Sequence, residues 1–332
     1  NRMEQAKVQN LALTAARSRL LALDMVYGAA SGHIGGSLSS LDILTTLYFH
    51  VMRVNPDAPQ APERDRFVLS KGHCTPALYS TMAQRGFFPL EELKQFRRIE
   101  GHMSGHAEMR HVKGVDMSTG SLGQGISAAV GMALAGKADG RDYRVYALLG
   151  DGEIEEGQVW EAAMAAAKYR LDNLCAVVDV NGLQIDGATA DVMPSEPLDQ
   201  KFEAFNWNVI RVDGHDYAAL AEAFAAAAAC KGKPTVLLAR TVKGKGVSFM
   251  EGDCKPAGLI YYASAGNISQ FKFIMPMPRN IRLKNTLIAG CIQSVMQHLA
   301  FVSNSLFQAA VQIHFFNFWH EGPSFYGRII LF

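Results

Sequence analysis

The sequence predicts an α/β protein with an open, doubly wound, mostly parallel sheet and helices on both of its faces. Short apolar runs alternate along the chain with longer segments of helical periodicity, and polar or glycine-rich turns separate them. The clearest unit is a strand at residues 143–149, a helix at 159–169 and a strand at 174–179. Because a helix between two strands requires a crossover, this order predicts a parallel pair.

The other expected elements follow in chain order. We expect helices at residues 6–27, 41–51, 76–85 and 217–230, and an alanine-rich helix that ends near residue 137. We expect further strands at 66–70, 207–212 and 235–240. Two glycine-rich loops, at 28–36 and 118–125, precede helices, and the second one lets backbone N–H groups approach an anion closely.

The composition is that of a soluble globular protein, with 332 residues and a formal net charge of +1. This balance provides no long-range field, so neither nucleic acid nor a membrane is an expected partner. The five cysteines are scattered and form no Cys-x-x-Cys pair, which argues against a disulfide framework or a structural zinc site and favours the cytoplasm. The N-terminal residues have the periodicity of an amphipathic helix rather than the pattern of a signal peptide.

The character of the chain changes at about residue 252. Asp253 and Glu321 are the only acidic residues after that point, and residues 285–320 contain no Asp, Glu, Lys or Arg. Polar side chains such as Gln293 and His298 interrupt this span, which disfavours a membrane helix. We therefore expect a globular domain at residues 1–251 and an atypical, low-charge segment at 252–332, which we interpret as a frameshifted or non-homologous addition.

The strongest chemical signal is Gly150-Asp151-Gly152 at the end of one predicted strand, with Asn181 just after the next strand. A divalent cation on a diphosphate needs hard oxygen ligands, and the Asp151 carboxylate, the Asn181 amide and the Leu183 carbonyl provide three. On its own, Gly-Asp-Gly is more typical of a turn between elements. The position of Asn181 at the neighbouring strand end favours the metal interpretation.

A family resemblance begins in the same region. Residues 150–187, GDGEIEEGQVWEAAMAAAKYRLDNLCAVVDVNGLQIDG, resemble the thiamine diphosphate motif of the transketolase family. The resemblance continues through SGHIGGSLS, LSKGHCTPALY, GHAE, MSTGSLGQGIS and TVKGKGVSFM, and so covers residues 6–251. Pyruvate dehydrogenase-type and deoxyxylulose phosphate synthases share the GDG and Asn elements, but their flanking segments are less similar. The chain most resembles the separately encoded N-terminal, diphosphate-binding subunit of split bacterial transketolase, and the fold implied is the thiamine diphosphate-binding fold.

The resemblance implies thiamine diphosphate as cofactor, with Mg²⁺, or Ca²⁺ or Mn²⁺ in its place. It assigns Asp151, Asn181 and the Leu183 carbonyl to the metal. It places Leu122 and Ile185 against the bent cofactor, and it places Glu156 between the two cofactor sites of a dimer. The implied cofactor-binding residues are His73, Gly120, Leu122, Gly150, Asp151, Gly152, Glu156, Asn181 and Ile185.

Three histidines, His33, His73 and His106, match positions that line the family's substrate channel, and Glu156 completes the implied catalytic set. An imidazole near neutrality can donate to a substrate carbonyl or move hydroxyl protons. A single histidine is more often a satisfied structural residue. Each of these three lies in a glycine-flanked loop of a matching motif, which favours the functional interpretation.

The resemblance implies a transferase that moves a two-carbon ketol unit between sugar phosphates, in carbohydrate metabolism and the pentose phosphate pathway. The aminopyrimidine-binding domain would be a separate partner subunit. Self-association would give a dimer or, with that partner, a heterotetramer. We expect the chain to be inactive alone.

Two alternatives stay open. The first is a subunit of another thiamine diphosphate carboligase, such as a dihydroxyacetone or deoxyxylulose phosphate synthase. The second is a catalytically damaged homologue that binds only cofactor or partner. This second alternative is supported by one departure from the family pattern. After GKGVSFME, residues 252–256 (GDCKP) stand where the family has a Trp-His-Gly loop.

Overall fold

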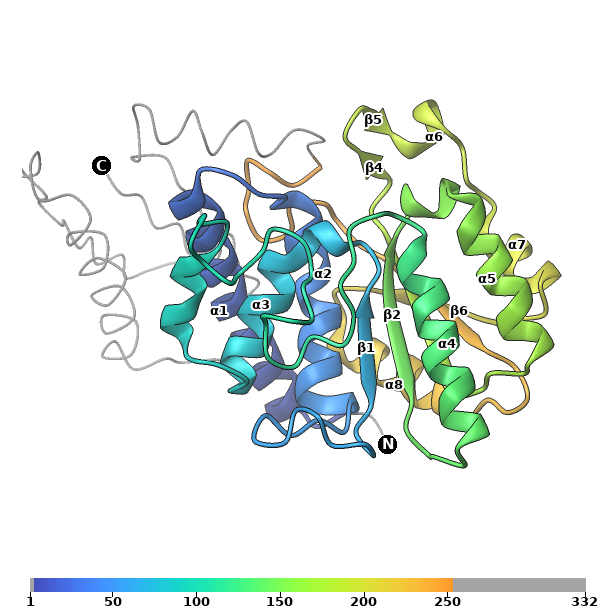
Figure 1. The fold of residues 1–332 in the computed structure, drawn as a ribbon. Coiled ribbons are helices and arrows are strands. Elements are labelled where there is room, and N and C mark those ends of the chain that lie inside the picture. The colour runs from blue at the N-terminus through green and yellow to red at the C-terminus, as the bar shows by residue number, and fades with distance from the viewer. Residues whose placement is uncertain (1–2, 253–332) are drawn as a thin grey trace, which may run out of the picture. The chain divides into compact units, whose positions relative to one another are not determined.

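Five parallel strands form the central sheet in the computed structural model, which describes residues 3–252 (Figure 1). Their order across the sheet is β1-β2-β3-β7-β6. All five match strands expected from the sequence, and all the pairs are parallel, so the predicted fold class is confirmed. The strands are β1 (Arg66–Leu69), β2 (Val145–Gly150), β3 (Leu174–Val180), β6 (Asn208–Asp213) and β7 (Thr235–Arg240).

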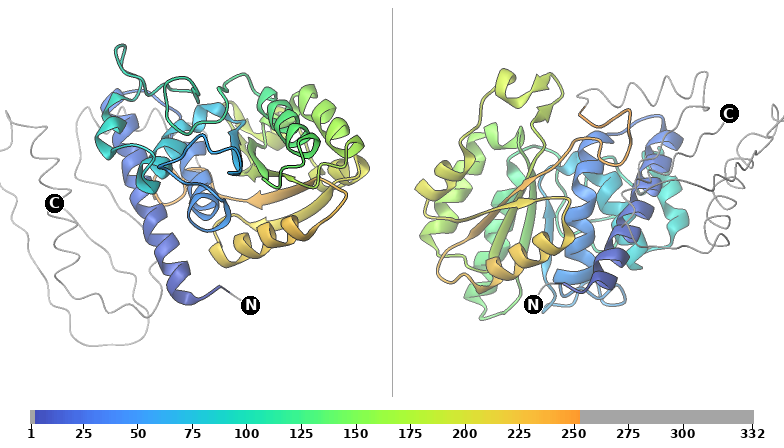
Figure 2. Two further views of the ribbon diagram at one scale, coloured as in Figure 1. Left: turned by 60° about the horizontal axis from the view of Figure 1, so that its bottom comes forward. Right: turned by 180° about the vertical axis from the view of Figure 1, so that it is seen from behind.

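Helices cover both faces of this sheet because alternate side chains of each buried strand point to opposite sides. In β2, Tyr146 and Leu148 join one hydrophobic cluster, whereas Val145, Ala147 and Leu149 join the other. The two views in Figure 2 show α8 and α4 on opposite sides of the sheet. The first cluster includes residues of α1 (Gln5–Ala29), α2 (Gly35–Thr46), α3 (Thr75–Arg85) and α8 (Tyr217–Ala229). The second includes residues of α4 (Gln124–Ala138), α5 (Gly157–Lys168) and α7 (Leu198–Ala204).

A small hairpin extends beyond the carboxyl end of β3 (Figure 1). It pairs β4 (Leu183–Gln184) with β5 (Gly187–Ala188), and the one-turn helix α6 (Thr189–Val192) follows. The sequence pattern did not predict this hairpin. The carboxyl ends of parallel strands meet at one edge of a sheet, so the hairpin stands beside the ends of β2 and β7 as well.

The second helix begins earlier than the sequence predicts. Residues 28–36 were expected to be a loop, but α2 starts at Gly35 and continues into a π-helical turn, Leu47–Val51. Buried serines make this start stable: Ser37 Oγ donates to the His33 carbonyl and Ser40 Oγ to the Gly36 carbonyl, both at 2.7 Å. Their hydroxyl groups are thereby satisfied inside an otherwise apolar helix.

The described residues belong to one compact unit of the chain. No helix among residues 3–252 is long and apolar enough to cross a membrane. The predicted C-terminal region, 252–332, lies outside the described residues except for Gly252, so its interpretation as a frameshifted or non-homologous segment stays a prediction.

Candidate functional site

The site begins at the end of β2, where the chain turns through Asp151. The Asp151 residue is 4% exposed, and its two carboxylate oxygens accept different backbone N–H groups. Gly152 donates to Oδ1 at 2.9 Å, and Gly182, which follows β3, donates to Oδ2 at 2.5 Å. The Asp151 side chain therefore ties the end of β2 to the end of β3.

Asn181 and Leu183 extend the same group of oxygens. Asn181 Oδ1 accepts the Leu183 N–H at 3.1 Å, and Asn181 Nδ2 donates to Asp179 Oδ2 at 3.3 Å. The Leu183 carbonyl accepts from Lys243 Nζ at 3.4 Å. The structure thus brings the three residues predicted as metal ligands to two neighbouring strand ends.

The chemistry of this group fits a divalent cation. Burial, together with the nearby Asp179 charge, raises the pKa of Asp151 to about 6. A cation beside the carboxylate would reverse this effect, because it favours the ionised form. A carboxylate, an amide oxygen and a carbonyl oxygen are ligands that Mg²⁺ prefers. Among the described residues, no cluster of three or more His, Cys, Asp or Glu has a metal-binding arrangement, so this mixed set is the candidate.

The glycines of the site allow chain segments to approach one another closely. A Cβ on Gly152 would lie 2.7 Å from Gln184 Oε1, so the hairpin passes directly over the Gly-Asp-Gly turn. A Cβ on Gly120 would lie 3.2 Å from the His106 ring. Gly150 is the last residue of β2. The predicted glycines therefore line the two loops that border the end of the sheet.

The three predicted histidines form one cluster. The His33 and His73 ring centroids are 5.0 Å apart in an edge-to-face arrangement, and the His33 and His106 centroids are 6.4 Å apart. Partial burial and the neighbouring His73 lower the pKa of His33 to about 4. Burial and Lys71 lower the pKa of His73 to about 4, and burial followed by Arg97 lowers that of His106. The rings of His33 and His73 are therefore neutral at pH 7, and the lowered pKa of His106 favours its neutral form.

Three other predicted residues are more open. Glu156 is exposed at the start of α5, close enough to Gly123 that a Cβ on Gly123 would meet its own Cβ at 2.8 Å. Ile185, at the tip of the hairpin, is 68% exposed, and Leu122 is half-buried. The structure does not gather these side chains with the histidines or with Asp151 into one cluster.

Sequence reasoning missed a buried ion pair beneath the site. Lys71 Nζ contacts Asp179 Oδ2 and donates to the Gly36 carbonyl at 3.0 Å. Asp179 also accepts from Ser39 Oγ at 2.6 Å and from Thr241 Oγ1. The available signal was a charged residue at the end of the apolar run LCAVVD, since a buried carboxylate requires a partner.

A second buried carboxylate, Glu153, was also missed. It is 2% exposed and accepts from Ser70 Oγ at 2.5 Å, from Gly123 N–H at 2.9 Å and from Gly150 N–H at 3.0 Å. These donors belong to the loop after β1, to the loop before α4 and to the last residue of β2. Glu153 therefore links three of the segments that surround the site.

The parallel sheet and the polar groups at the carboxyl ends of β2 and β3 define an α/β protein with a candidate ligand site at its strand ends. Residues 10–273 match the family model described as transketolase, thiamine diphosphate binding domain, and the chain belongs to this family. This confirms the family indicated by the sequence resemblance.

Two similar proteins are transketolase subunits, and the matched segment covers most of each of them. One, from Clostridium sp., is a subunit of a 6-deoxy-6-sulfo-D-fructose transketolase and is 49% identical over 234 residues, which are 70% of this chain and 85% of that protein. The other, from Phocaeicola vulgatus, is a subunit of an apulose-4-phosphate transketolase and is 45% identical over 249 residues, or 75% of this chain and 88% of that one.

Solved transketolases share the fold over part of their length. The Campylobacter jejuni enzyme superposes with a TM-score of 0.71 at 36% identity, covering 75% of this chain and 40% of its own. The chain therefore spans about two-fifths of the length of this transketolase.

Proposed function

We propose that the chain binds thiamine diphosphate through a divalent cation, Mg²⁺ or in its place Ca²⁺ or Mn²⁺, held by Asp151, Asn181 and the Leu183 carbonyl. The observation that carries the proposal is the bond between Gly182 N–H and Asp151 Oδ2 at 2.5 Å, which brings the two strand-end loops together. The match to a thiamine diphosphate-binding domain supports the identity of the ligand. When bound, thiamine diphosphate supplies carbanion stabilisation at a carbonyl carbon.

The histidine cluster has the properties required for handling a polyhydroxylated substrate. A neutral imidazole offers one N–H donor and one acceptor nitrogen. His33, His73 and His106 can therefore hold substrate hydroxyl and carbonyl groups and move hydroxyl protons without adding positive charge. Gly120, packed on the His106 ring, fixes one side of the cluster. Leu122 and Ile185 would contact the apolar parts of the cofactor.

We further propose that the chain is the diphosphate-binding subunit of a two-chain transketolase, which transfers a two-carbon ketol unit between sugar phosphates in cytoplasmic carbohydrate metabolism, including the pentose phosphate pathway. The names of the two subunit relatives support a partner chain. That partner would carry the aminopyrimidine-binding domain, and the assembly would be a dimer or a heterotetramer with Glu156 between its cofactor sites. Neither nucleic acid nor a membrane is a partner in this proposal.

Titration calorimetry tests the cofactor site. Thiamine diphosphate with Mg²⁺ would be titrated into the chain, into Asp151→Ala and into Asp139→Ala, a matched control with an exposed carboxylate at the end of α4. We expect binding to the parent chain and to Asp139→Ala, but none to Asp151→Ala. Equal binding by both variants would contradict the site.

A second experiment tests the reaction. The chain would be mixed with the C-terminal subunit of a split transketolase, and glycolaldehyde transfer would be compared with pyruvate decarboxylation. Transfer without decarboxylation is the expected result. Decarboxylation would favour a deoxyxylulose phosphate synthase-type subunit, and cofactor binding without either reaction would favour a catalytically damaged homologue.

A further inference from the structure

Residues 241–246 run from the end of β7 along the border of the proposed cofactor site. Thr241 Oγ1 donates to Asp179, and Lys243 Nζ donates to the Leu183 carbonyl at 3.4 Å. Further along, Gly244 N–H donates to the Gly35 carbonyl at 3.0 Å, beside the His33 loop. The segment is therefore hydrogen-bonded both to groups at the end of β3 and to the start of α2.

The segment's own sequence makes it pliable. Gly244 and Gly246 have φ values of +79° and +90°, in the left-handed region that glycine adopts most readily. Two glycines in three residues leave the unconstrained backbone many conformations, so contacts from outside the segment must select one. Besides the bonds described above, two such contacts come from the side chains of His215 and Arg19.

His215, in the loop between β6 and α8, makes the first contact. Its Nε2 accepts the Val242 N–H at 2.9 Å, and its Nδ1 lies 2.7 Å from Asp42 Oδ2. A nitrogen that accepts from an N–H carries no proton, and a nitrogen that faces a carboxylate donates one. The two contacts thus select one neutral tautomer and make the ring a rigid link between Asp42 and the segment.

Asp42 also contacts Arg19, which makes a second contact with residues 241–246. The Asp42 side chain is 4% exposed and accepts from Arg19 Nη2 at 2.6 Å, and the Tyr217 hydroxyl donates to its other oxygen. Arg19 also donates from Nε to the Lys245 carbonyl at 3.1 Å. Burial alone would raise the pKa of Asp42, but Arg19 and His215 outweigh it and lower the pKa to about 2. One ionised carboxylate therefore holds the segment at two points.

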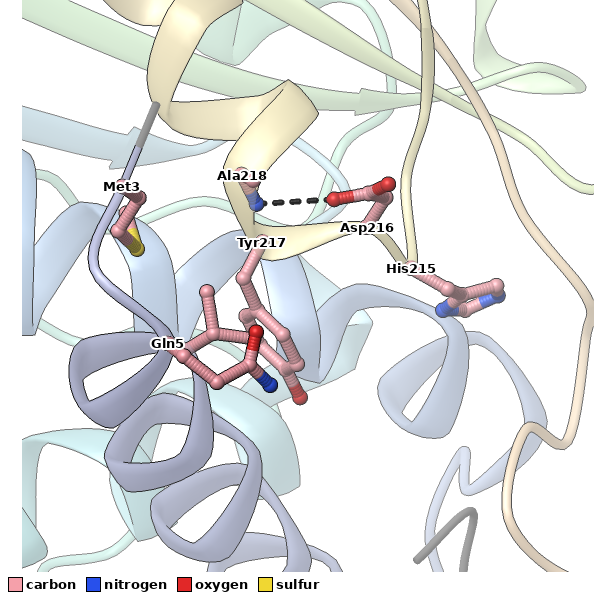
Figure 3. A pocket seen from close by; sticks show the side chains of 7 residues that line it. Met3, Gln5, His215, Asp216, Tyr217 and Ala218 are labelled. Atoms are coloured by element: carbon pink, nitrogen blue, oxygen red, sulfur yellow. Dashed lines mark hydrogen bonds between the residues drawn. The ribbon is translucent and has the colours of Figure 1, made fainter. Parts of the chain in front are cut away.

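The neighbouring pocket does not explain this arrangement. Figure 3 shows His215 and Tyr217 lining a pocket together with Met3 and Gln5, and the His215 ring points away from these two residues. Both ring nitrogens of His215 already have partners, so neither is left to bind a molecule in the pocket.

We propose that His215, oriented by Asp42, is a positioning residue that holds residues 241–246 against the end of β3 and thereby sets the affinity for the cofactor. The identity of that cofactor rests on the proposed function. The positioning itself follows from the contacts of this chain alone.

Two amides that each replace one ring nitrogen test the proposal in the full chain. In His215→Asn, the side-chain NH₂ stands in for Nδ1–H and keeps the Asp42 contact, but Val242 N–H loses its acceptor. In His215→Gln, the longer amide reaches the position of Nε2 and keeps that acceptor. Tyr217→Phe is the matched control, because it removes a bond to Asp42 that does not continue to the segment.

We expect the dissociation constant for thiamine diphosphate with Mg²⁺ to rise about tenfold in His215→Asn, and to stay within about threefold in His215→Gln and Tyr217→Phe, because only the first leaves Val242 N–H unpaired. Amide hydrogen exchange at Val242 and Gly244 should accelerate only in His215→Asn. Each His215 variant loses one hydrogen bond, so we expect a similar fall in Tm in both. A general loss of stability would therefore not explain a difference in cofactor affinity or exchange rate between them.

Equal affinities and equal exchange rates in the two His215 variants would overturn the positioning role. So would losses of affinity in all three variants that follow Tm. A parent chain that binds no thiamine diphosphate would contradict the proposed function instead. The exchange rates would then decide the positioning by themselves, because faster exchange in His215→Asn than in His215→Gln supports it and equal exchange overturns it.

Discussion

Lys71 and Asp179 form an ion pair beneath the proposed cofactor site, with side-chain exposures of 2% and 0%. Burial would lower the pKa of Lys71, but the Asp179 charge outweighs it and raises that pKa above its usual value. For Asp179, burial acts to raise the pKa, and Lys71 and the hydrogen bonds to the carboxylate lower it overall. Both groups are therefore charged, and each depends on the other.

We predict that Lys71→Met is strongly destabilising, because it leaves the Asp179 carboxylate buried without its counter-ion. Breaking a buried pair in this way costs about 3–5 kcal/mol. The double variant with Asp179→Leu should unfold at a higher urea concentration than Lys71→Met, since it removes the unpaired charge. Additive losses of unfolding free energy in the two single variants and the double variant would show that the pair is not coupled.

Most of the sheet could be predicted because its strands are buried on both faces and appear as short apolar runs. The run LCAVVD, for example, corresponds to β3, and its pairing with β2 followed from the intervening helix. The start of α2 could not be predicted, because Gly35 and Gly36 are typical of loops. Only the buried environment, in which Ser37 and Ser40 bond back to the helix, makes a helix favourable there.

The candidate site could be predicted only where a polar residue comes directly after the apolar run of a strand. Asp151 and Asn181 each come just after an apolar run, so the sheet brings them together. Lys71 and Asp179 lie 108 positions apart, and their contact depends on strand register and on the packing of α2, which local patterns do not encode. Glu156 and Ile185 are both exposed in this chain, and the roles proposed for them need groups outside it.

Glu153→Gln should loosen the loops that Glu153 links. All three of its partners, Ser70 Oγ and the N–H groups of Gly123 and Gly150, are donors, so a side-chain NH₂ would face a donor. A mismatch of this kind costs about 1–3 kcal/mol. We expect a lower urea midpoint and weaker cofactor binding. Glu222→Gln, an exposed control on α8, should change neither, and a parent-like Glu153→Gln would contradict the linking role.

The histidine cluster should make stability depend on pH below neutrality. The pKa values of His33 and His73 are about 4 in the folded chain, below the value of about 6.5 in unfolded peptides. The unfolded chain therefore binds more protons between these values, and stability should fall as the pH drops from 6.5 towards 4. His73→Gln should flatten this dependence. NMR titration would check it directly, and a His73 midpoint near 6.5 would contradict the neutral cluster.

Gly72→Ala should disturb the site through the backbone rather than through charge. A Cβ on Gly72 would lie 2.5 Å from Thr119 Oγ1, 2.6 Å from the Thr119 carbonyl carbon and 2.7 Å from Gly120 N. Thr119 cannot move aside without losing two hydrogen bonds, from its Oγ1 to the Leu69 carbonyl at 2.6 Å and from its N–H to the Ala107 carbonyl at 3.0 Å.

Overpacking of this kind costs about 1–3 kcal/mol, so we expect Gly72→Ala to lower Tm and to weaken cofactor binding as Gly120 shifts. Gly131→Ala is the matched control, because it lies within α4 and a Cβ there meets nothing within 4 Å. It should raise the free energy of unfolding by about 0.5–1 kcal/mol through the better helix propensity of alanine. If Gly72→Ala instead lowered Tm and left cofactor affinity intact, the loop containing Gly120 would not be part of the binding site, and the glycine contacts there would serve folding alone.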